Sequence, residues 1–270
     1  MLLKYLLLAA STATVWARGA PWYPLADLSS LIAHDGSPVG TEEVHNGYNL
    51  YITKPPGHTK ATKAVLYLTD VFGIQLAQNK LLADSFARAG FLTVAPDLFG
   101  GSPAPGDINV PGFNTTAFLA QHGPDKTDPI VAAALSYIQS LGIPRIGATG
   151  YCYGGRYAFR AAGTLGNTTA NFDAVDAVFA AHPSLLSDDE INASKAPASI
   201  AAAETDSLMS VARRTEITAL LQNSGNEYSF AVYGGTSHGF GVRANVTDPR
   251  QKFAKEEAFL QAARWFSVWL

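Results

Sequence analysis

The chain has one cysteine, Cys152, and it lies in a glycine-rich segment that could make it a nucleophile. Residues 150–155 are Gly-Tyr-Cys-Tyr-Gly-Gly, with a short apolar run before them and a helical pattern after them. A nucleophile elbow requires this order of strand, tight turn and helix, and the flanking glycines leave room for its strained backbone. A buried structural cysteine at a strand end is the alternative, because free cysteine is among the most buried residue types.

An acid and a histidine follow Cys152 in the order that an α/β-hydrolase triad uses. Asp206 follows the apolar run 198–203, and His238 lies in a glycine-flanked loop after the run 228–234. Both would reach the carboxyl edge of a parallel sheet, where such folds bind ligands. A helix N-cap and an ordinary loop histidine are the respective alternatives. The ordered set predicts a nucleophile, a base that takes its proton and a carboxylate that orients the base.

These groups indicate covalent chemistry on a carbonyl. A free thiol is only a few per cent ionised at neutral pH, so it needs a neighbouring base and the positive end of a helix. The backbone N–H groups of Tyr153 and, on the hydrolase template, Val71 would stabilise the oxyanion. Water activated by His238 would then hydrolyse the acyl-thioester on Cys152. A thiolate is easily expelled when the competing leaving group is a poor amine, so esters and lactones are the expected substrates.

Five motifs, taken in order, resemble the dienelactone hydrolase family of α/β-hydrolases over most of residues 40–270. The motifs occupy residues 69–73, 95–99, 150–155, 204–206 and 237–240. The resemblance implies a single-domain α/β-hydrolase fold, with Cys152 as nucleophile, His238 as general base and then acid, and Asp206 as orienting carboxylate. In bacterial members an additional glutamate switches the thiol to thiolate when substrate binds. Asp70 occupies that position here, in a version that resembles fungal relatives of the family.

Four further residues are candidates for substrate binding. Tyr151 and Phe240, together with Tyr153 and Phe72, could form an aromatic wall, with plain packing as the alternative. His182 ends a strand at the active-site edge, or else is satisfied by backbone. Arg243 resembles the arginine that holds the substrate carboxylate in dienelactone hydrolases, although the family spacing is one residue shorter. The second carboxylate-binding arginine of the family has no match, because no arginine occurs between Arg88 and Arg145. Recognition of an anionic dienelactone is therefore not favoured.

Alternating strand and helix patterns predict the elements that must position these residues. They indicate a mainly parallel sheet covered by helices on both faces. The expected elements are an antiparallel ribbon over 40–54, strands at 64–69, 91–95, 145–149, 175–181, 198–203 and 228–234, and helices at 76–89, 129–141, 156–162, 207–221 and 251–269. Residues 100–128 are rich in proline and glycine, which predicts an irregular insertion over the pocket or, equally, a surface loop.

Composition sets limits on the class of protein. The 270 residues are 47% hydrophobic and 15% charged, which is typical of one compact domain with a substantial core. The net charge is −3 and the basic residues are scattered, so the sequence shows no basic surface for nucleic-acid binding. The six histidines are dispersed, so no metal site is expected, and no cofactor is required. The expected partner is a small ester or lactone, and the sequence does not indicate an oligomeric state.

The first 17 residues have the composition of a secretory signal peptide. Lys4 precedes the apolar run 6–15, and small residues follow. This run is shorter than the about 20 residues that span a membrane, so no stable membrane association is expected. A buried N-terminal helix is the alternative. Residues 18–39 would be an extension and 40–270 the hydrolase domain. Four Asn-x-Ser/Thr sequons support a secreted glycoprotein, at Asn114, Asn167, Asn192 and Asn245.

The sequence therefore predicts a secreted carboxylic ester hydrolase of the carboxymethylenebutenolidase type. A lone thiol in an oxidising compartment favours a functional cysteine over a structural one. Hydrolysis of a polyketide lactone, a phenolic ester or a thioester is an alternative within the same chemistry. A non-catalytic protein of hydrolase fold that binds a small molecule is the alternative from another class.

Overall fold

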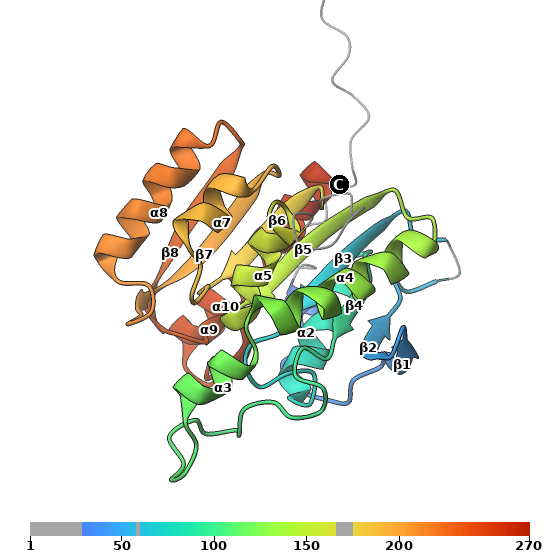
Figure 1. The fold of residues 1–270 in the computed structure, drawn as a ribbon, viewed down its shortest axis with the longest axis horizontal. Helices are drawn as coiled ribbons and strands as arrows, with labels where there is room; N and C mark the ends of the chain where they lie inside the picture. Colours follow the sequence, from blue (N-terminus) through green and yellow to red (C-terminus); the bar gives the residue numbers. More distant parts are fainter. Residues whose placement is uncertain (1–28, 58–59, 166–174) are drawn as a thin grey trace, which may run out of the picture.

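A computed structural model describes residues 29–57, 60–165 and 175–270. The predicted signal peptide and the sequon at Asn167 lie outside the described residues. The described chain forms an eight-stranded sheet in the order β1-β2-β4-β3-β5-β6-β7-β8 (Figure 1). The strands are β1 (Thr41–His45), β2 (Tyr48–Thr53), β3 (Lys63–Leu68), β4 (Leu92–Pro96), β5 (Arg145–Tyr151), β6 (Ala177–Ala181), β7 (Ala198–Thr205) and β8 (Tyr228–Ser237).

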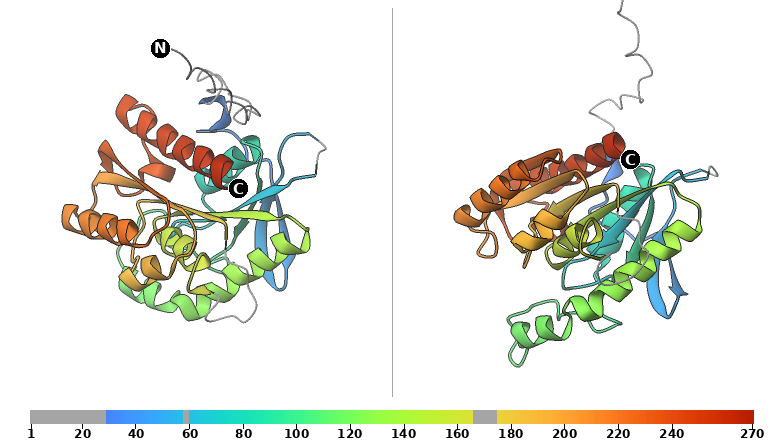
Figure 2. Two further views of the ribbon diagram at one scale, coloured as in Figure 1. Left: turned by 90° about the horizontal axis from the view of Figure 1, so that it is seen from above. Right: turned by 45° about the horizontal axis from the view of Figure 1, so that its top comes forward.

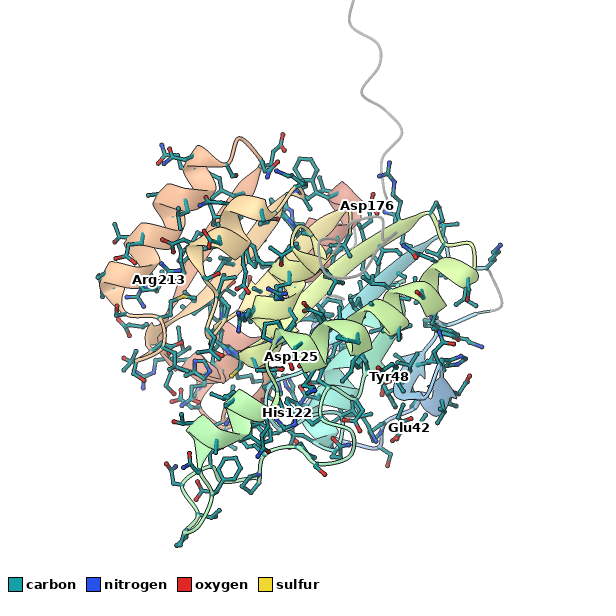
Figure 3. All side chains as sticks on the ribbon, in the orientation of Figure 1. Glu42, Tyr48, His122, Asp125, Asp176 and Arg213 are labelled. Atoms are coloured by element: carbon teal, nitrogen blue, oxygen red, sulfur yellow. The ribbon has the colours of Figure 1, made fainter. Side chains whose placement is uncertain are left out.

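Strand pairing confirms the predicted mainly parallel sheet. The β1–β2 and β2–β4 pairs are antiparallel, and every later pair is parallel. The parallel strands therefore present their carboxyl ends at one edge, where loops can bring distant residues together. His122 and Asp125 lie toward that end of the sheet, and Asp176 lies at the opposite end (Figure 3). The antiparallel ribbon over 40–54 is confirmed.

Helices cover both faces of the sheet (Figure 2). Residues of α4, α5, α7 and α8 share one apolar cluster, and residues of α2 and α10 share the other. The helical elements are η1 (Ser29–Leu31), α2 (Ala77–Arg88), α3 (Thr115–Gln121), α4 (Pro124–Ser140), α5 (Tyr153–Ala161), α7 (Asp188–Ala193), α8 (Val211–Asn223), α9 (Phe240–Arg243) and α10 (Pro249–Trp269). In the described residues, no helix combines the length and the apolar character that a membrane crossing needs.

Strand β3 contributes side chains to the apolar clusters on both faces of the sheet. Leu66 and Leu68 belong to the cluster under α4 and α5, whereas Val65 and Tyr67 belong to the cluster under α2 and α10. Successive side chains of a strand point to opposite faces, so a central strand buried on both sides must be apolar almost throughout. Full burial of such a side chain contributes roughly 1.5–3 kcal/mol. The apolar runs of the sequence thus form the central strands. Their burial on both faces holds the carboxyl ends of these strands in place.

The segment 100–128 is more regular than the sequence suggested. It contains α3, and α4 begins at Pro124 rather than at Pro129. Proline at the first helical position costs no hydrogen bond, because that N–H has no partner within the helix. Pro129 lies inside α4, and the sequence analysis mistook this second proline for the helix start. By contrast, the helix expected over 207–221 begins later than predicted, at Val211.

Candidate active site

Cys152 lies at the sharp turn between β5 and α5, the position of a nucleophile elbow. Its backbone has φ 52° and ψ −114°, a left-handed conformation that is strained for a residue with a side chain. Its N–H donates to Ala181 O at 3.1 Å, which fixes the turn against β6. Tyr153 is the first residue of α5, so its N–H has no partner within the helix and is available to a ligand.

Three glycines are required around this turn. A Cβ at Gly150 would lie 2.1 Å from Gly154 O, and a Cβ at Gly154 would lie 2.2 Å from Leu68 O. A Cβ at Gly155 would lie 2.7 Å from the Pro183 side chain. All three distances are shorter than any real Cβ contact, so backbone would have to move. The glycines occur at these positions because α5 packs too closely against β3 and β5 to leave room for side chains.

Asp206 and His238 meet at the carboxyl edge of the sheet. Asp206 follows β7 and accepts a hydrogen bond from His238 Nδ1 at 2.8 Å, and its other oxygen accepts from Leu208 N at 2.9 Å. The Asp206 side chain is fully buried and that of His238 is 22% exposed. The N-cap of the next helix is Ser210, so Asp206 does not have the N-cap role that was its alternative. Its carboxylate is left to orient the His238 ring.

Electrostatics favour a protonated His238. Burial opposes its charge, but the hydrogen bond with Asp206 and the proximity of Cys152 outweigh burial and raise the pKa of His238 from 6.5 to about 10. Because Nδ1 is bonded to Asp206, Nε2 is the ring nitrogen that could exchange a proton with Cys152. Nε2 is buried and makes no hydrogen bond of normal geometry in the described structure. Such bonds are often loose in an empty site and tighten when substrate binds.

Cys152 and His238 line the same cavity, which has a volume of about 540 Å³. The cavity lies between the sheet edge and the segment 104–119, and nine of its lining residues come from that segment. They are Ala104, Gly106, Asp107, Ile108, Asn109, Phe113, Thr115, Phe118 and Leu119. The proline-rich stretch is therefore an insertion over the pocket, the first of its two interpretations. Val71 also lines the cavity.

Ser184 is a cavity residue that the sequence analysis did not single out. Its hydroxyl lies 3.7 Å from Cys152 Sγ, within hydrogen-bond distance for sulfur. Its N–H donates to Cys152 O at 3.0 Å, so the loop after β6 is attached to the elbow. The only signal in the sequence was its place two residues after the strand-end His182.

Asp70 and Arg243 form an ion pair at the floor of the site. Arg243 Nε donates to Asp70 Oδ2 at 3.2 Å, and its guanidinium lies over the Phe72 ring, 4.5 Å from the centroid. The other Asp70 oxygen accepts from Asn79 Nδ2 at 2.8 Å and from Phe72 N at 3.2 Å. Burial raises the pKa of Asp70, although Asn79 and Arg243 oppose the rise. Arg243 lines the cavity, whereas Asp70 is buried behind it.

Three predicted substrate-binding residues do not line this cavity. Tyr151 is the last residue of β5, so its side chain points to the opposite face and packs on Tyr67, with ring centroids 5.2 Å apart. Phe240 is 3% exposed and packs against Tyr233 and His182. Of the four residues of the expected aromatic wall, only Phe72 lines this cavity in the described structure, and plain packing is the correct interpretation for Tyr151, Tyr153 and Phe240.

His182 lies behind His238 rather than in the cavity. It is fully buried, its ring centroid lies 5.0 Å from that of His238, and neither ring nitrogen has a hydrogen-bond partner in the described structure. Burial and the nearby charges of His238 and Arg243 hold the pKa of His182 well below 6.5, so the ring stays neutral. The His182 side chain therefore packs against the His238 ring and does not line the cavity.

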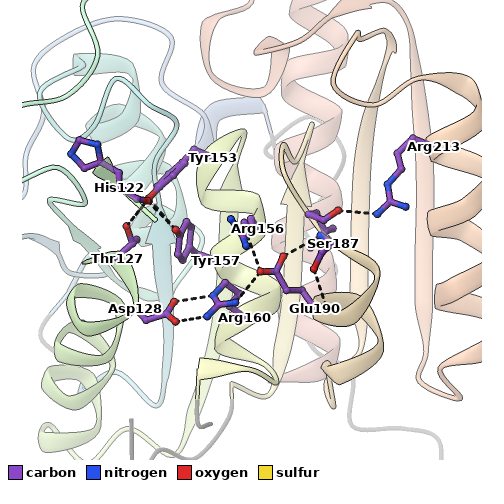
Figure 4. Close-up of polar contacts among 11 residues, drawn as sticks. His122, Thr127, Asp128, Tyr153, Arg156, Tyr157, Arg160, Ser187, Glu190 and Arg213 are labelled. Carbon is purple, nitrogen blue, oxygen red and sulfur yellow. Dashed lines mark hydrogen bonds and ion pairs between the residues drawn. The ribbon is translucent and has the colours of Figure 1, made fainter. Parts of the chain in front are cut away.

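A buried charge network holds α5 from both sides (Figure 4). The Arg160 guanidinium binds Asp128 of α4 through two nitrogens, and it binds Glu190 of α7 at 2.9 Å. Arg156 also donates to Glu190, at 2.8 Å. Glu190 accepts from Ser187 N as part of a capping box, which connects α7 to the loop that carries Ser184. The network fixes the helix α5, whose N-cap residue is Cys152.

Hydroxyl groups attach the same helix to the α3–α4 connection. Tyr153 OH donates to His122 O at 2.5 Å, and it lies 2.5 Å from Thr127 Oγ1 and 3.1 Å from Tyr157 OH (Figure 4). The Tyr153 side chain thus connects the start of α5 to the segment between α3 and α4 and to the first turn of α4. Within the described ranges, no group of three or more His, Cys, Asp or Glu side chains could hold a metal ion.

Comparison with known proteins gives a consistent result. A model of the dienelactone hydrolase family matches residues 49–270. "Hydrolase pyvD" of Aspergillus violaceofuscus is 38% identical over 239 residues, which cover 88% of this chain and 93% of the relative. "Dienlactone hydrolase 1" of Gibberella moniliformis is 28% identical and covers 91% of this chain and 94% of its own length.

Solved structures agree on the fold. A dienelactone hydrolase structure from Klebsiella pneumoniae aligns with a TM-score of 0.66 at 19% identity, over 85% of this chain and 98% of that one. The eight-stranded sheet with helices on both faces is the α/β-hydrolase fold, as the sequence predicted. With the family model spanning β2 to α10 and relatives matched over nearly their whole length, this chain belongs to the dienelactone hydrolase family of α/β-hydrolases and is a hydrolase.

Proposed function

We propose that this protein cleaves a small carboxylic ester or lactone by covalent catalysis at Cys152, with His238 as base and acid and Asp206 as the orienting carboxylate. One observation carries the proposal: Cys152, strained at the elbow, shares a cavity with a histidine whose Nδ1 is bonded to a buried carboxylate at 2.8 Å. A structural cysteine would require neither the strain nor the shared cavity. Relatives that are named hydrolases support the same reading.

The first step is attack of the Cys152 sulfur on the carbonyl carbon. The thiol proton passes to His238 Nε2, and the C–O π electrons move to oxygen. The raised pKa of His238 favours this transfer, and the positive end of α5 stabilises the anion on sulfur. The Ser184 hydroxyl, 3.7 Å from Sγ, donates to the same anion. The N–H groups of Tyr153 and Val71 stabilise the oxyanion.

The intermediate then collapses to an acyl-thioester. The C–O bond to the alcohol breaks, and the imidazolium of His238 returns its proton to that oxygen. With the sulfur neutral, His238 loses the partner that helped to raise its pKa, and it becomes a base for water. Water attacks the thioester, the acid is released, and Cys152 regains its proton. A lactone follows the same steps, with acid and alcohol remaining in one product.

Mass spectrometry tests this proposal directly. Wild-type protein and Cys152→Ala would be exposed briefly to p-nitrophenyl acetate, and the intact masses and peptide maps compared. The expected result is one acetyl group on Cys152 that disappears as product forms and is absent from the variant. Turnover by Cys152→Ala at the wild-type rate would contradict the nucleophile. No adduct and no product, from protein with a reduced thiol, would favour the non-catalytic binding protein.

We also propose that residues 1–17 direct the chain to secretion and that its sequons carry glycans. The composition of residues 1–17 supports the first point. Asn114, Asn192 and Asn245 are exposed, which supports the second. Expression in a eukaryotic secretory host would test both, by N-terminal sequencing of the secreted protein and by its loss of mass with a glycosidase. Retention of residue 1 in the secreted form would refute the first.

A further inference from the structure

The charges around the cavity do not favour an anionic substrate. Of the described residues that line it, Arg243 is the one arginine or lysine, and its guanidinium is paired with the buried Asp70. Asp107 also lines the cavity, and Asp206 lies behind His238. Negative charges therefore outnumber positive ones whether the proton lies on Cys152 or on His238. An additional carboxylate on the substrate would meet net repulsion in a partly enclosed space.

The mouth of the cavity is apolar instead. Three large hydrophobic side chains line it and are exposed: Ile108 by 37%, Leu185 by 49% and Leu208 by 53%. They come from the cover, from the loop after β6 and from the loop after β7, so they surround the opening from separate elements. Single exposed hydrophobic residues are ordinary, but several around one opening indicate a ligand. We call Ile108, Leu185 and Leu208 the apolar rim.

Leu185 reaches the rim through a strained backbone. Its φ is 59°, a conformation that is uncommon for a leucine. Its neighbours hold it there, because Ser184 N donates to Cys152 O at 3.0 Å and Leu186 O accepts from Arg213 Nη2 at 2.8 Å. The structure thus maintains an unfavourable conformation that exposes an apolar side chain beside the nucleophile. Strain of this kind is concentrated at functional sites.

We infer that the substrate is a neutral ester or lactone with an apolar substituent, an alkyl chain or an aromatic ring, that lies against the apolar rim. The inference rests on the proposed hydrolytic function. Asp70 has a part in this selection, because its carboxylate neutralises Arg243 and so removes the one fixed positive charge that could bind an anion. It is a positioning residue for Arg243 and does not contact the reacting atoms.

A chain-length series tests the rim. The measurement is kcat/KM for p-nitrophenyl esters from acetate to octanoate, expressed as the ratio of octanoate to acetate. Each methylene that becomes buried raises kcat/KM roughly three- to fourfold until the rim is covered. Leu185→Asn, which suits a left-handed backbone, and Leu208→Ser should each lower the ratio about tenfold. Val232→Ser, at an exposed apolar residue of β8 outside this cavity, should keep the wild-type ratio.

An ester pair tests the charge. The p-nitrophenyl monoester of glutaric acid carries a carboxylate, and its methyl ester is neutral. The wild type should prefer the neutral ester at least about tenfold. In Asp70→Asn the amide oxygen keeps the bonds from Asn79 and Phe72 N, and the amide NH₂ faces Arg243 without neutralising it. This variant should shift the preference toward the anion several-fold, whereas Asp125→Asn, at an exposed carboxylate, should not.

The outcomes separate this inference from the proposed function. Turnover with an octanoate-to-acetate ratio that neither leucine variant changes would overturn the rim and leave covalent hydrolysis intact. Equal use of the charged and neutral esters by the wild type would overturn the selection against anions. No turnover of any ester, with a reduced Cys152 thiol, would overturn both proposals.

Discussion

Replacement of Asp206 by asparagine should abolish most activity, because it reverses the hydrogen-bond pattern at His238. In the structure Asp206 Oδ1 accepts from Leu208 N and Oδ2 accepts from His238 Nδ1. In Asp206→Asn the backbone donor holds the amide oxygen, so the NH₂ group faces Nδ1. Nδ1 must then act as acceptor, which moves the ring proton to Nε2. In this tautomer His238 cannot take the thiol proton from Cys152.

The size of the effect follows from two contributions. A hydrogen bond to a charged group contributes about 1.5–3 kcal/mol, which is roughly 10- to 150-fold in the population of the imidazolium–thiolate pair. The hydrogen bond with Asp206 is also the main interaction that opposes the effect of burial on the pKa of His238. Without it, burial would lower this pKa. The wrong tautomer adds to this, and the equivalent change in a serine protease costs roughly 10⁴ in kcat. We expect kcat/KM to fall by roughly 10³ or more.

Glu204→Gln is the matched control. Glu204 is an exposed acid two residues away whose Oε2 accepts from Gly235 N at 2.7 Å, a bond that glutamine keeps. The assay is kcat/KM with p-nitrophenyl acetate, together with the rate of Cys152 alkylation by iodoacetamide as a function of pH. Glu204→Gln should stay within about threefold of wild type in both. Equal losses in the two variants, with unchanged melting temperatures, would refute the assignment of Asp206.

Three further predictions concern stability. Gly150→Ala should destabilise the fold by at least about 2 kcal/mol in urea unfolding, because its Cβ would overlap backbone, whereas Gly106→Ala, with open space around it, should change little. Asp128→Asn removes the charge that pairs with a buried guanidinium of α5 and should cost roughly 3 kcal/mol, against under about 0.5 kcal/mol for the exposed Asp125→Asn; equal values would contradict a structural role for the network. The raised pKa of His238 stabilises the fold fully below about pH 6.5, and this contribution is lost as pH rises through about 10; unfolding free energies of wild type and His238→Gln that stay parallel between pH 6 and 10 would contradict it.

Local rules in the sequence predicted the elbow and the sheet. Gly150 and Gly154 are required because an added Cβ would lie 2.1 and 2.2 Å from backbone oxygens, so this short motif reflects packing between separate elements. Nearly continuous apolar runs predicted the parallel strands, because the sheet is buried on both faces. Strand order then brings Asp206 and His238 to one edge, since β7 and β8 are neighbours.

Contacts between elements far apart in the chain could not be predicted in this way. Tyr151 adjoins the nucleophile in sequence, yet the alternation of β5 places its ring on the opposite face. This error was avoidable, because successive side chains of a strand point to opposite faces. No local signal indicates that Arg160 pairs with Asp128, 32 residues away, or that Ser184 lies beside the thiol across the same separation. These pairings depend on tertiary geometry that periodicity does not encode.

The residues that cover the cavity come from a different part of the chain than Cys152, Asp206 and His238. The thiol, the imidazole and the carboxylate project from turns that the sheet fixes, whereas half of the eighteen cavity residues come from segment 104–119. Exchange of that segment would alter which molecules enter without disturbing the reacting atoms. In engineering terms the molecule is modular: a new specificity could be introduced by grafting a single stretch of chain between β4 and α4.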